Sequence, residues 1–145
     1  MTAPRPDFTG IWRVDLARSQ LKIPPPREMV MRITHREPEF VQDVRTVDGA
    51  GGVRSGRFAG VTGGTEFTSQ IGGAPSVSRA AWDGTELTIR SLLSFGGNEI
   101  ELADIWSLSG DGAEMRMEHR SGMLAGQITI LTRVTDPAEA GIFDG

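Results

Sequence analysis

The fold of this chain is decided by residues 86–120, with the sequence ELTIRSLLSFGGNEIELADIWSLSGDGAEMRMEHR. Apolar and polar residues alternate in three runs, and a period of two is the pattern of half-buried strands. The runs are separated by Gly96-Gly97 and by Gly110-Asp111-Gly112, and glycine and aspartate favour tight turns. The stretch therefore predicts three consecutive antiparallel strands at Glu86–Phe95, Glu99–Leu108 and Glu114–Arg120.

The same alternation, punctuated by glycine, continues on both sides of this stretch. It predicts further strands at Phe8–Leu16, Glu28–Arg36, Phe40–Val47, Val53–Ala59, Thr65–Ile71, Val77–Trp82 and Gln127–Val134. No long helix is expected. A meander of nine or ten strands leaves two open edges unless the sheet closes on itself. We therefore expect an all-β fold, a closed antiparallel up-and-down β-barrel of about 8–10 strands, with a two-sheet sandwich as the alternative.

Length and composition narrow the possible functions. The 145 residues suit one domain spanning 1–145, in which we expect 1–7 and 136–145 to be loose tails. Cysteine is absent, which excludes disulfides, thiolate metal sites and a cysteine nucleophile. The net charge is −4 and the arginines are scattered along the chain, whereas a nucleic-acid binder carries a basic patch. We expect no nucleic-acid partner.

The distribution of apolar residues bears on location. No stretch approaches the roughly 20 apolar residues that span a bilayer, and the first residues, MTAPRPD, contain no apolar run of a signal peptide. We expect a cytoplasmic protein without a membrane span. The oligomeric state is not predicted.

Several short motifs resemble those of a known superfamily. The stretch Phe8-Thr-Gly-Ile-Trp12 resembles the opening of the calycin superfamily, which includes the lipocalins and the fatty-acid-binding proteins. More of the chain is similar to a group of bacterial lipocalin-like proteins of largely unassigned function, through Ala17-Arg-Ser19, Ile33–Pro38, Ala81–Gly84 and Asp104–Gly112. The likeness is thinnest at Gly49–Gly73, where the strand register is not predicted.

This resemblance implies a barrel with one packed end and one open end. Trp12 would plug the packed end, and Arg133 would lay its guanidinium over the indole ring. The inward faces of the strands would then line a cavity for one small ligand.

Three ionisable residues fall on faces that are otherwise apolar: His35, Asp104 and His119. Such groups need a partner or a ligand, so these are the candidate catalytic residues, with a histidine and Asp104 able to do acid–base work. Each has a structural alternative. His35 would be a strand-end histidine bonded to backbone, Asp104 a partner for an arginine or a backbone amide, and His119 a core histidine with its hydrogen bonds satisfied.

Methionines dominate two of the same faces. Methionine adapts to varied apolar shapes, so a methionine-lined wall suits a hydrophobic ligand, although ordinary core filling is the alternative. The expected ligand-binding residues are Met29, Met31, Ile33, Phe95, Trp106, Met115 and Met117.

Together these features predict binding of a small hydrophobic molecule in the barrel. The alternative is an enzyme on the same barrel, an isomerase, hydratase, lyase or cyclase that uses a His/Asp pair on an apolar substrate; a filled barrel with an interaction role is the third hypothesis. We expect no cofactor and no metal, because no His-x-His or His-x-x-x-His spacing supports zinc or ferrous iron. Haem held by His35 or His119 is a weaker alternative.

Overall fold

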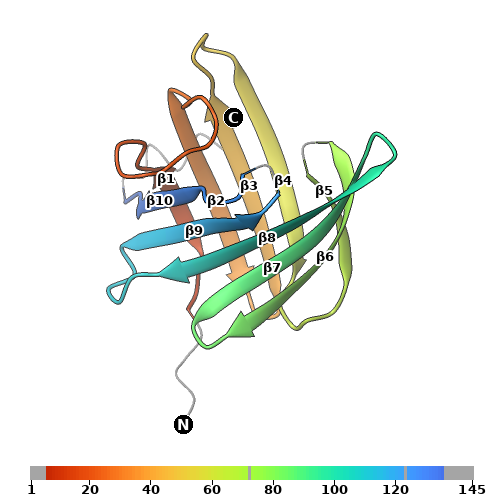
Figure 1. The fold of residues 1–145 in the computed structure, drawn as a ribbon. Coiled ribbons are helices and arrows are strands. Elements are labelled where there is room, and N and C mark those ends of the chain that lie inside the picture. Colours follow the sequence, from red (N-terminus) through yellow and green to blue (C-terminus); the bar gives the residue numbers. More distant parts are fainter. Residues whose placement is uncertain (1–5, 72, 123, 136–145) are drawn as a thin grey trace.

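We describe residues 6–71, 73–122 and 124–135 of the protein in a computed structural model (Figure 1). They form ten strands and no helix: β1 (Gly10–Val14), β2 (Glu28–Arg36), β3 (Glu39–Val47), β4 (Val53–Val61), β5 (Phe67–Ile71), β6 (Ala74–Asp83), β7 (Glu86–Phe95), β8 (Asn98–Leu108), β9 (Glu114–Ser121) and β10 (Ile128–Arg133). The expected tail at 136–145, and residues 1–5 of the other, lie outside the described residues. In the ranges described, no helix has the length and apolarity that a membrane crossing requires.

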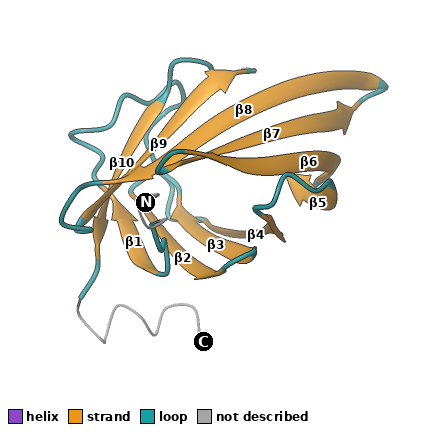
Figure 2. Ribbon diagram, turned by 90° about the horizontal axis from the view of Figure 1, so that it is seen from below, coloured by secondary structure: helices purple, strands orange, loops and turns teal. Residues whose placement is uncertain are grey.

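The ten strands form one antiparallel up-and-down sheet in the order β4-β3-β2-β1-β10-β9-β8-β7-β6-β5. Pairing of β1 with β10 joins the two ends of the chain, with Trp12 opposite Arg133. The sheet curls into a nearly closed barrel whose edge strands are β4 and β5 (Figures 1 and 2). The predicted barrel is confirmed over the sandwich.

Aromatic side chains pack at the seam between β4 and β5. Phe67 on β5 lies edge-on to Phe58 on β4 and to Phe40 on β3, with ring centroids 5.8 and 6.0 Å away. Gly60 on β4 makes room for this ring, because a Cβ there would lie 2.3 Å from Phe67 atoms. Side-chain packing thus brings the two edge strands together.

The strand bounds follow the predicted ones closely, and two differences have clear causes. The first strand is shorter than predicted because Phe8 and Thr9 precede the ladder, where the Phe8 carbonyl accepts a hydrogen bond from the Trp12 indole. The β4 strand runs to Val61 rather than Ala59, and Gly56 does not interrupt it because it pairs in register with Val44. The register that could not be predicted at Gly49–Gly73 is therefore a regular β3–β4 ladder followed by a β5–β6 hairpin.

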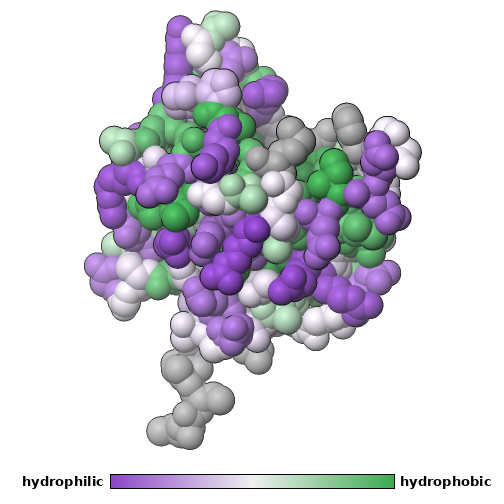
Figure 3. Space-filling model, in the orientation of Figure 1, coloured by the Kyte–Doolittle hydropathy of each residue, from purple (hydrophilic) through white to green (hydrophobic). Residues whose placement is uncertain are grey.

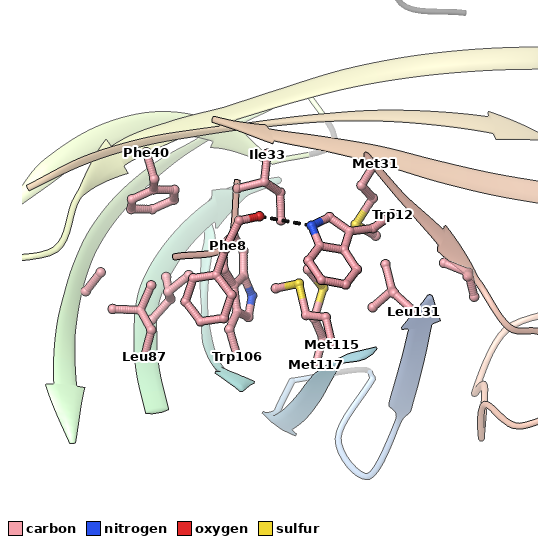
Figure 4. Close-up of a cluster of buried hydrophobic side chains, with 13 residues drawn as sticks. Phe8, Trp12, Met31, Ile33, Phe40, Leu87, Trp106, Met115, Met117 and Leu131 are labelled. Atoms are coloured by element: carbon pink, nitrogen blue, oxygen red, sulfur yellow. Dashed lines mark hydrogen bonds between the residues drawn. The ribbon is translucent and has the colours of Figure 1, made fainter. Parts of the chain in front are cut away.

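One end of the barrel is filled by side chains around Trp12, and we call it the closed end (Figure 4). Trp12 is fully buried and donates its Nε1–H to the Phe8 carbonyl at 2.9 Å. The Arg133 guanidinium carbon lies 4.3 Å from the indole centroid, and its Nη1 donates to the Thr9 carbonyl at 2.8 Å. The roles expected for Trp12 and Arg133 are confirmed.

The spacing of Gly10 and Trp12 has a physical cause in this arrangement. Gly10 has φ of 154°, and a Cβ there would collide with Arg133 Nη1. Glycine, which lacks a Cβ, therefore lets the guanidinium reach across the strand to the indole.

Candidate functional site

A cavity of about 680 Å³ occupies the other half of the barrel, which we call the open end. It is lined by Met29 and Met31 from the first half of β2, whereas the last residues of β2 belong to the closed end. Ile23 and Leu124, from the β1–β2 and β9–β10 connections, also line it. On the face of the molecule shown in Figure 3, hydrophobic residues are visible mainly in the upper half. In the same orientation in Figure 1, the β3–β4 and β7–β8 turns point toward this half.

Two walls of the cavity are apolar. Strands β2, β3 and β4 contribute Met29, Met31, Val44 and Phe58, and the facing strands β7, β8 and β9 contribute Ile89, Leu102, Trp106 and Met117. The alternation of the strands explains the placement, because every second residue points inward. These surfaces can hold an apolar body by excluding water from it.

A row of three polar side chains crosses the second wall, from Asp104 on β8 through His119 on β9 to Gln127, the residue before β10. Asp104 is paired with His119 in the ladder, and His119 donates its backbone N–H to the Gln127 carbonyl at 2.9 Å. All three residues line the cavity. We call them the polar row.

Asp104 and His119 are in direct contact. His119 Nδ1 lies 2.5 Å from Asp104 Oδ1, and the side chains are 24% and 27% exposed. The pair sits beside an irregularity in the β8–β9 ladder, where Ala103 pairs with Ser121 and one residue of β9 is left over. The arrangement can move or share a proton at the cavity surface.

A second charged cluster at the cavity edge is already paired. Arg57 lines the cavity, but its Nε donates to Asp43 Oδ1 at 2.7 Å, and Arg32 donates to the other Asp43 oxygen at 3.2 Å. Burial raises the pKa of Asp43, but hydrogen bonds and charge from the two arginines outweigh it, so the pKa lies below its usual value. The Arg57 side chain is 66% exposed, and Asp43 holds it on the outer face of the sheet, since both residues alternate with cavity-lining neighbours.

His35 lies at the closed end, away from the polar row. Its side chain is 2% exposed, stacks on Phe8 and Trp82, and accepts the Phe8 N–H at Nδ1. Its Nε2 lies 2.6 Å from Glu37 Oε1. This is the placement expected for a strand-end histidine bonded to backbone, and His35 is not among the described residues that line the cavity.

The other predicted site residues divide between the two ends. Met29, Met31, Met117 and Trp106 line the cavity. The last three also belong to the buried cluster of Figure 4, so they form the boundary between the cavity and the closed end. Ile33 and Met115 are 1% and 0% exposed in the closed-end core, where Met115 lies beside the Trp12 ring (Figure 4). The Phe95 side chain lies outside the described part of the structure.

Sequence reasoning missed Gln127, Thr129 and Gln42, which all line the cavity. Gln127 also ties two connections together, since its Oε1 accepts the Lys22 N–H at 2.9 Å. The alternation of β3 and β10 is the pattern that would have placed Gln42 and Thr129 inward. Among the residues described, no group of three or more His, Asp or Glu side chains is arranged to hold a metal ion.

Comparison with known proteins finds the fold in several solved structures. One is the REP1-NXSQ fatty acid transporter, with a TM-score of 0.63 and 13% identity, covering 88% of this chain and 96% of that one. Another is secretory abundant heat soluble protein 4 from Ramazzottius varieornatus, with a TM-score of 0.64 and 11% identity, covering 92% and 99%. The fatty-acid-binding protein of Manduca sexta matches with a TM-score of 0.50 and 10% identity, covering 88% and 100%.

Matches based on sequence are absent: no family model and no curated protein matches the chain. The identities to the solved structures are low, so the likeness concerns the fold. The resemblance to bacterial lipocalin-like proteins in particular stays a prediction. Strand order, the Trp12–Arg133 plug and these structural matches together show that the chain has a calycin-type small β-barrel fold.

Proposed function

We propose that the protein binds one small hydrophobic molecule inside the barrel. The observation that carries this proposal is the cavity of about 680 Å³ with its two apolar walls. Its volume falls within the range of about 300–1,000 Å³ typical of small-molecule sites. The proposed contacts are Met29, Met31, Trp106 and Met117, whose flexible or aromatic side chains adapt to an apolar ligand.

The structural comparisons support this proposal. A fatty acid transporter and a fatty-acid-binding protein, by their names, carry a hydrophobic cargo on this fold. Fold alone does not determine function, so the cavity of this chain carries the argument and the comparisons add to it.

Titration with the neutral hydrophobic dye Nile red tests the proposal. We expect saturable fluorescence enhancement on the wild-type protein, and a ligand released from the purified protein in native mass spectrometry. Gly56→Phe should weaken dye binding about tenfold or more, because Gly56 lines the cavity and a Cβ there meets only open space.

The matched control is Gly63→Phe, the same change in the exposed turn after β4, where a Cβ also meets open space. It should leave dye binding unchanged. Absence of saturable dye binding on the wild-type protein, with no ligand released, would contradict the proposed function.

Acid–base catalysis in the same cavity is the second candidate function. One observation favours it, the contact of 2.5 Å between His119 and Asp104 on the cavity wall. The neighbours whose names state a function are carriers and favour binding. If an apolar substrate is turned over, His119→Ala should abolish turnover, and intact turnover would remove His119 from the mechanism.

Two expectations about the surroundings of the protein are proposals as well. A cytoplasmic location is tested by fractionation of cells that make the full-length protein. The expected lack of nucleic-acid binding is tested by gel shift with double-stranded DNA and RNA at low salt, where electrostatic binding is strongest.

A further inference from the structure

We propose that the ligand carries a hydroxyl group, which His119 holds at the polar row, and that ligands with a carboxylate are disfavoured. This inference rests on the proposed binding function and names the class of ligand.

The first step is the hydrogen bonding of His119. Asp104 Oδ1 lies 2.5 Å from Nδ1, and a carboxylate accepts hydrogen bonds, so the ring carries a proton at Nδ1. Within the described residues, Nε2 has no hydrogen-bond partner, and His119 lines the cavity. Nε2 is therefore available to a ligand.

The second step is the chemistry that Nε2 offers. A neutral ring with its proton on Nδ1 presents a lone pair at Nε2, and a protonated ring presents an N–H. A hydroxyl group can donate to the first and accept from the second. It is thus complementary to His119 in either protonation state, which an ether or a carboxylate is not.

The third step is the position of the polar row. The next inward residues toward the closed end are Trp106, Met117 and Thr129, which pair across the same three strands. Beyond the polar row on the other side, Leu102 and Ser121 line the cavity. The polar row therefore lies between the apolar side chains of Trp106 and Met117 on one side and Leu102 on the other, which suits an apolar molecule with a polar group along its length or at one end.

The fourth step is electrostatic. A ligand carboxylate at the polar row would lie beside the Asp104 carboxylate, and two like charges in a partly water-excluded cavity repel each other. Arg57 is the single lysine or arginine among the described cavity-lining residues, and Asp43 holds its guanidinium. The cavity therefore lacks the uncommitted cation that an acid would require.

Displacement of Nile red from the purified full-length protein tests this inference. The competitors share one chain length: dodecan-1-ol, dodecyl methyl ether, and dodecanoate at about pH 8, where its carboxylate is ionised. We expect dodecan-1-ol to bind about tenfold more tightly than the other two, the size of one hydrogen bond to a charged or strongly polar group.

Variants assign the preference to residues. In His119→Phe the advantage of the alcohol over the ether should fall below about twofold, with Nile red still bound. Thr132→Val, which removes a hydroxyl from an exposed position of β10 outside the cavity, should keep the tenfold preference. In Asp104→Asn the affinity for dodecanoate should rise several-fold, because the like charge is gone.

The outcomes separate the two proposals. If the wild-type protein binds Nile red but prefers dodecanoate, or if the alcohol preference survives in His119→Phe, the hydroxyl inference is wrong and the binding function stands. If the wild-type protein binds neither dye nor competitors, the binding function itself fails. Should His119→Phe not fold, an unchanged ratio of acid to alcohol affinity in Asp104→Asn overturns the inference.

Discussion

The two ends of the barrel use polar atoms in opposite ways. At the closed end, the Trp12 indole bonds to the Phe8 carbonyl, Arg133 to the Thr9 carbonyl, and His35 to the Phe8 amide and to Glu37. At the open end, His119 contacts Asp104 through Nδ1 and lines the cavity. The polar groups named at the closed end are satisfied by the protein, whereas at the open end His119 Nε2 has no hydrogen-bond partner among the described residues.

The difference arises from the size of the inward side chains, since the backbone pattern is the same at both ends. The closed end places Phe8, Trp12 and Trp82 inward, with Phe8 and Trp82 stacked 5.9 Å apart. The open end places Gly56, Ser91 and flexible methionines inward. We infer that stability resides mainly in the closed end and binding in the open end, and substitutions can separate the two.

Trp12→Ala should have the largest effect on stability. Removing a fully buried tryptophan costs about 3–5 kcal/mol, and here it also leaves Arg133 without its aromatic face. Urea denaturation followed by circular dichroism measures the loss. His119→Phe at the open end is the comparison and should change the free energy of unfolding by about 1 kcal/mol or less; equal losses at the two ends would contradict the division.

Two methionines sharpen the comparison. Met115→Ala at the closed end should lower the free energy of unfolding by about 2–5 kcal/mol, because Met115 is fully buried, and leave Nile red affinity unchanged. Met29→Ala at the open end should cost about 1 kcal/mol, because its side chain is half-buried and faces the cavity, and weaken dye binding. Stability and dye titrations on both variants should thus give opposite rankings.

Two glycines extend the comparison to the backbone. Gly10→Ala should cost about 1–3 kcal/mol, since the new Cβ displaces the Arg133 guanidinium and the backbone has a φ of 154°. Gly56→Ala should stabilise the protein by about 0.5 kcal/mol, because the Cβ meets open space within a strand. Thermal unfolding of the two variants measures both changes, and destabilisation by Gly56→Ala would contradict the open space around Gly56.

Much of the fold follows from the sequence because alternation and glycine turns are local features. Glu28–Arg36 and Glu86–Phe95 have the predicted bounds. The contact between Trp12 and Arg133 is predicted by the family resemblance and not by alternation. The two residues lie 121 residues apart, and alternation does not predict which strands pair with each other.

The contact between Asp104 and His119 shows where local patterns are insufficient. Alternation turns both side chains inward, but their pairing depends on the turn between β8 and β9, because one more or one fewer residue there would move His119 away from Asp104. His35 shows the same limit, since alternation cannot say which end of a barrel is packed. Gln127 precedes β10 and is positioned by the β9–β10 connection through the His119 N–H bond, a contact that alternation does not predict.

The smallest expected effect on stability is that of Glu37, whose carboxylate connects three parts of the closed end. It accepts hydrogen bonds from Thr62 in the turn after β4 and from Trp82 on β6, and it contacts His35. Burial raises the pKa of this carboxyl, but hydrogen bonds from His35, Thr62 and Trp82 outweigh it, so the pKa in the folded protein lies below the ordinary 4.5. A carboxylate with a lowered pKa stabilises the fold above its unfolded pKa, and this contribution disappears as the pH falls through the folded value.

Glu37→Gln should therefore cost about 0.5–1 kcal/mol near neutral pH and progressively less as the pH is lowered below about 4.5. Asp7, near His35 at 3.8 Å, and Asp43 also have lowered pKa values, but they are present in both proteins, so the difference between the two stability curves isolates Glu37. Urea denaturation at a series of pH values measures that difference. If the two curves of unfolding free energy against pH stay parallel down to about pH 3, the contacts of residue 37 do not depend on its charge. Thr62 and Trp82 would then need only an acceptor oxygen at this position.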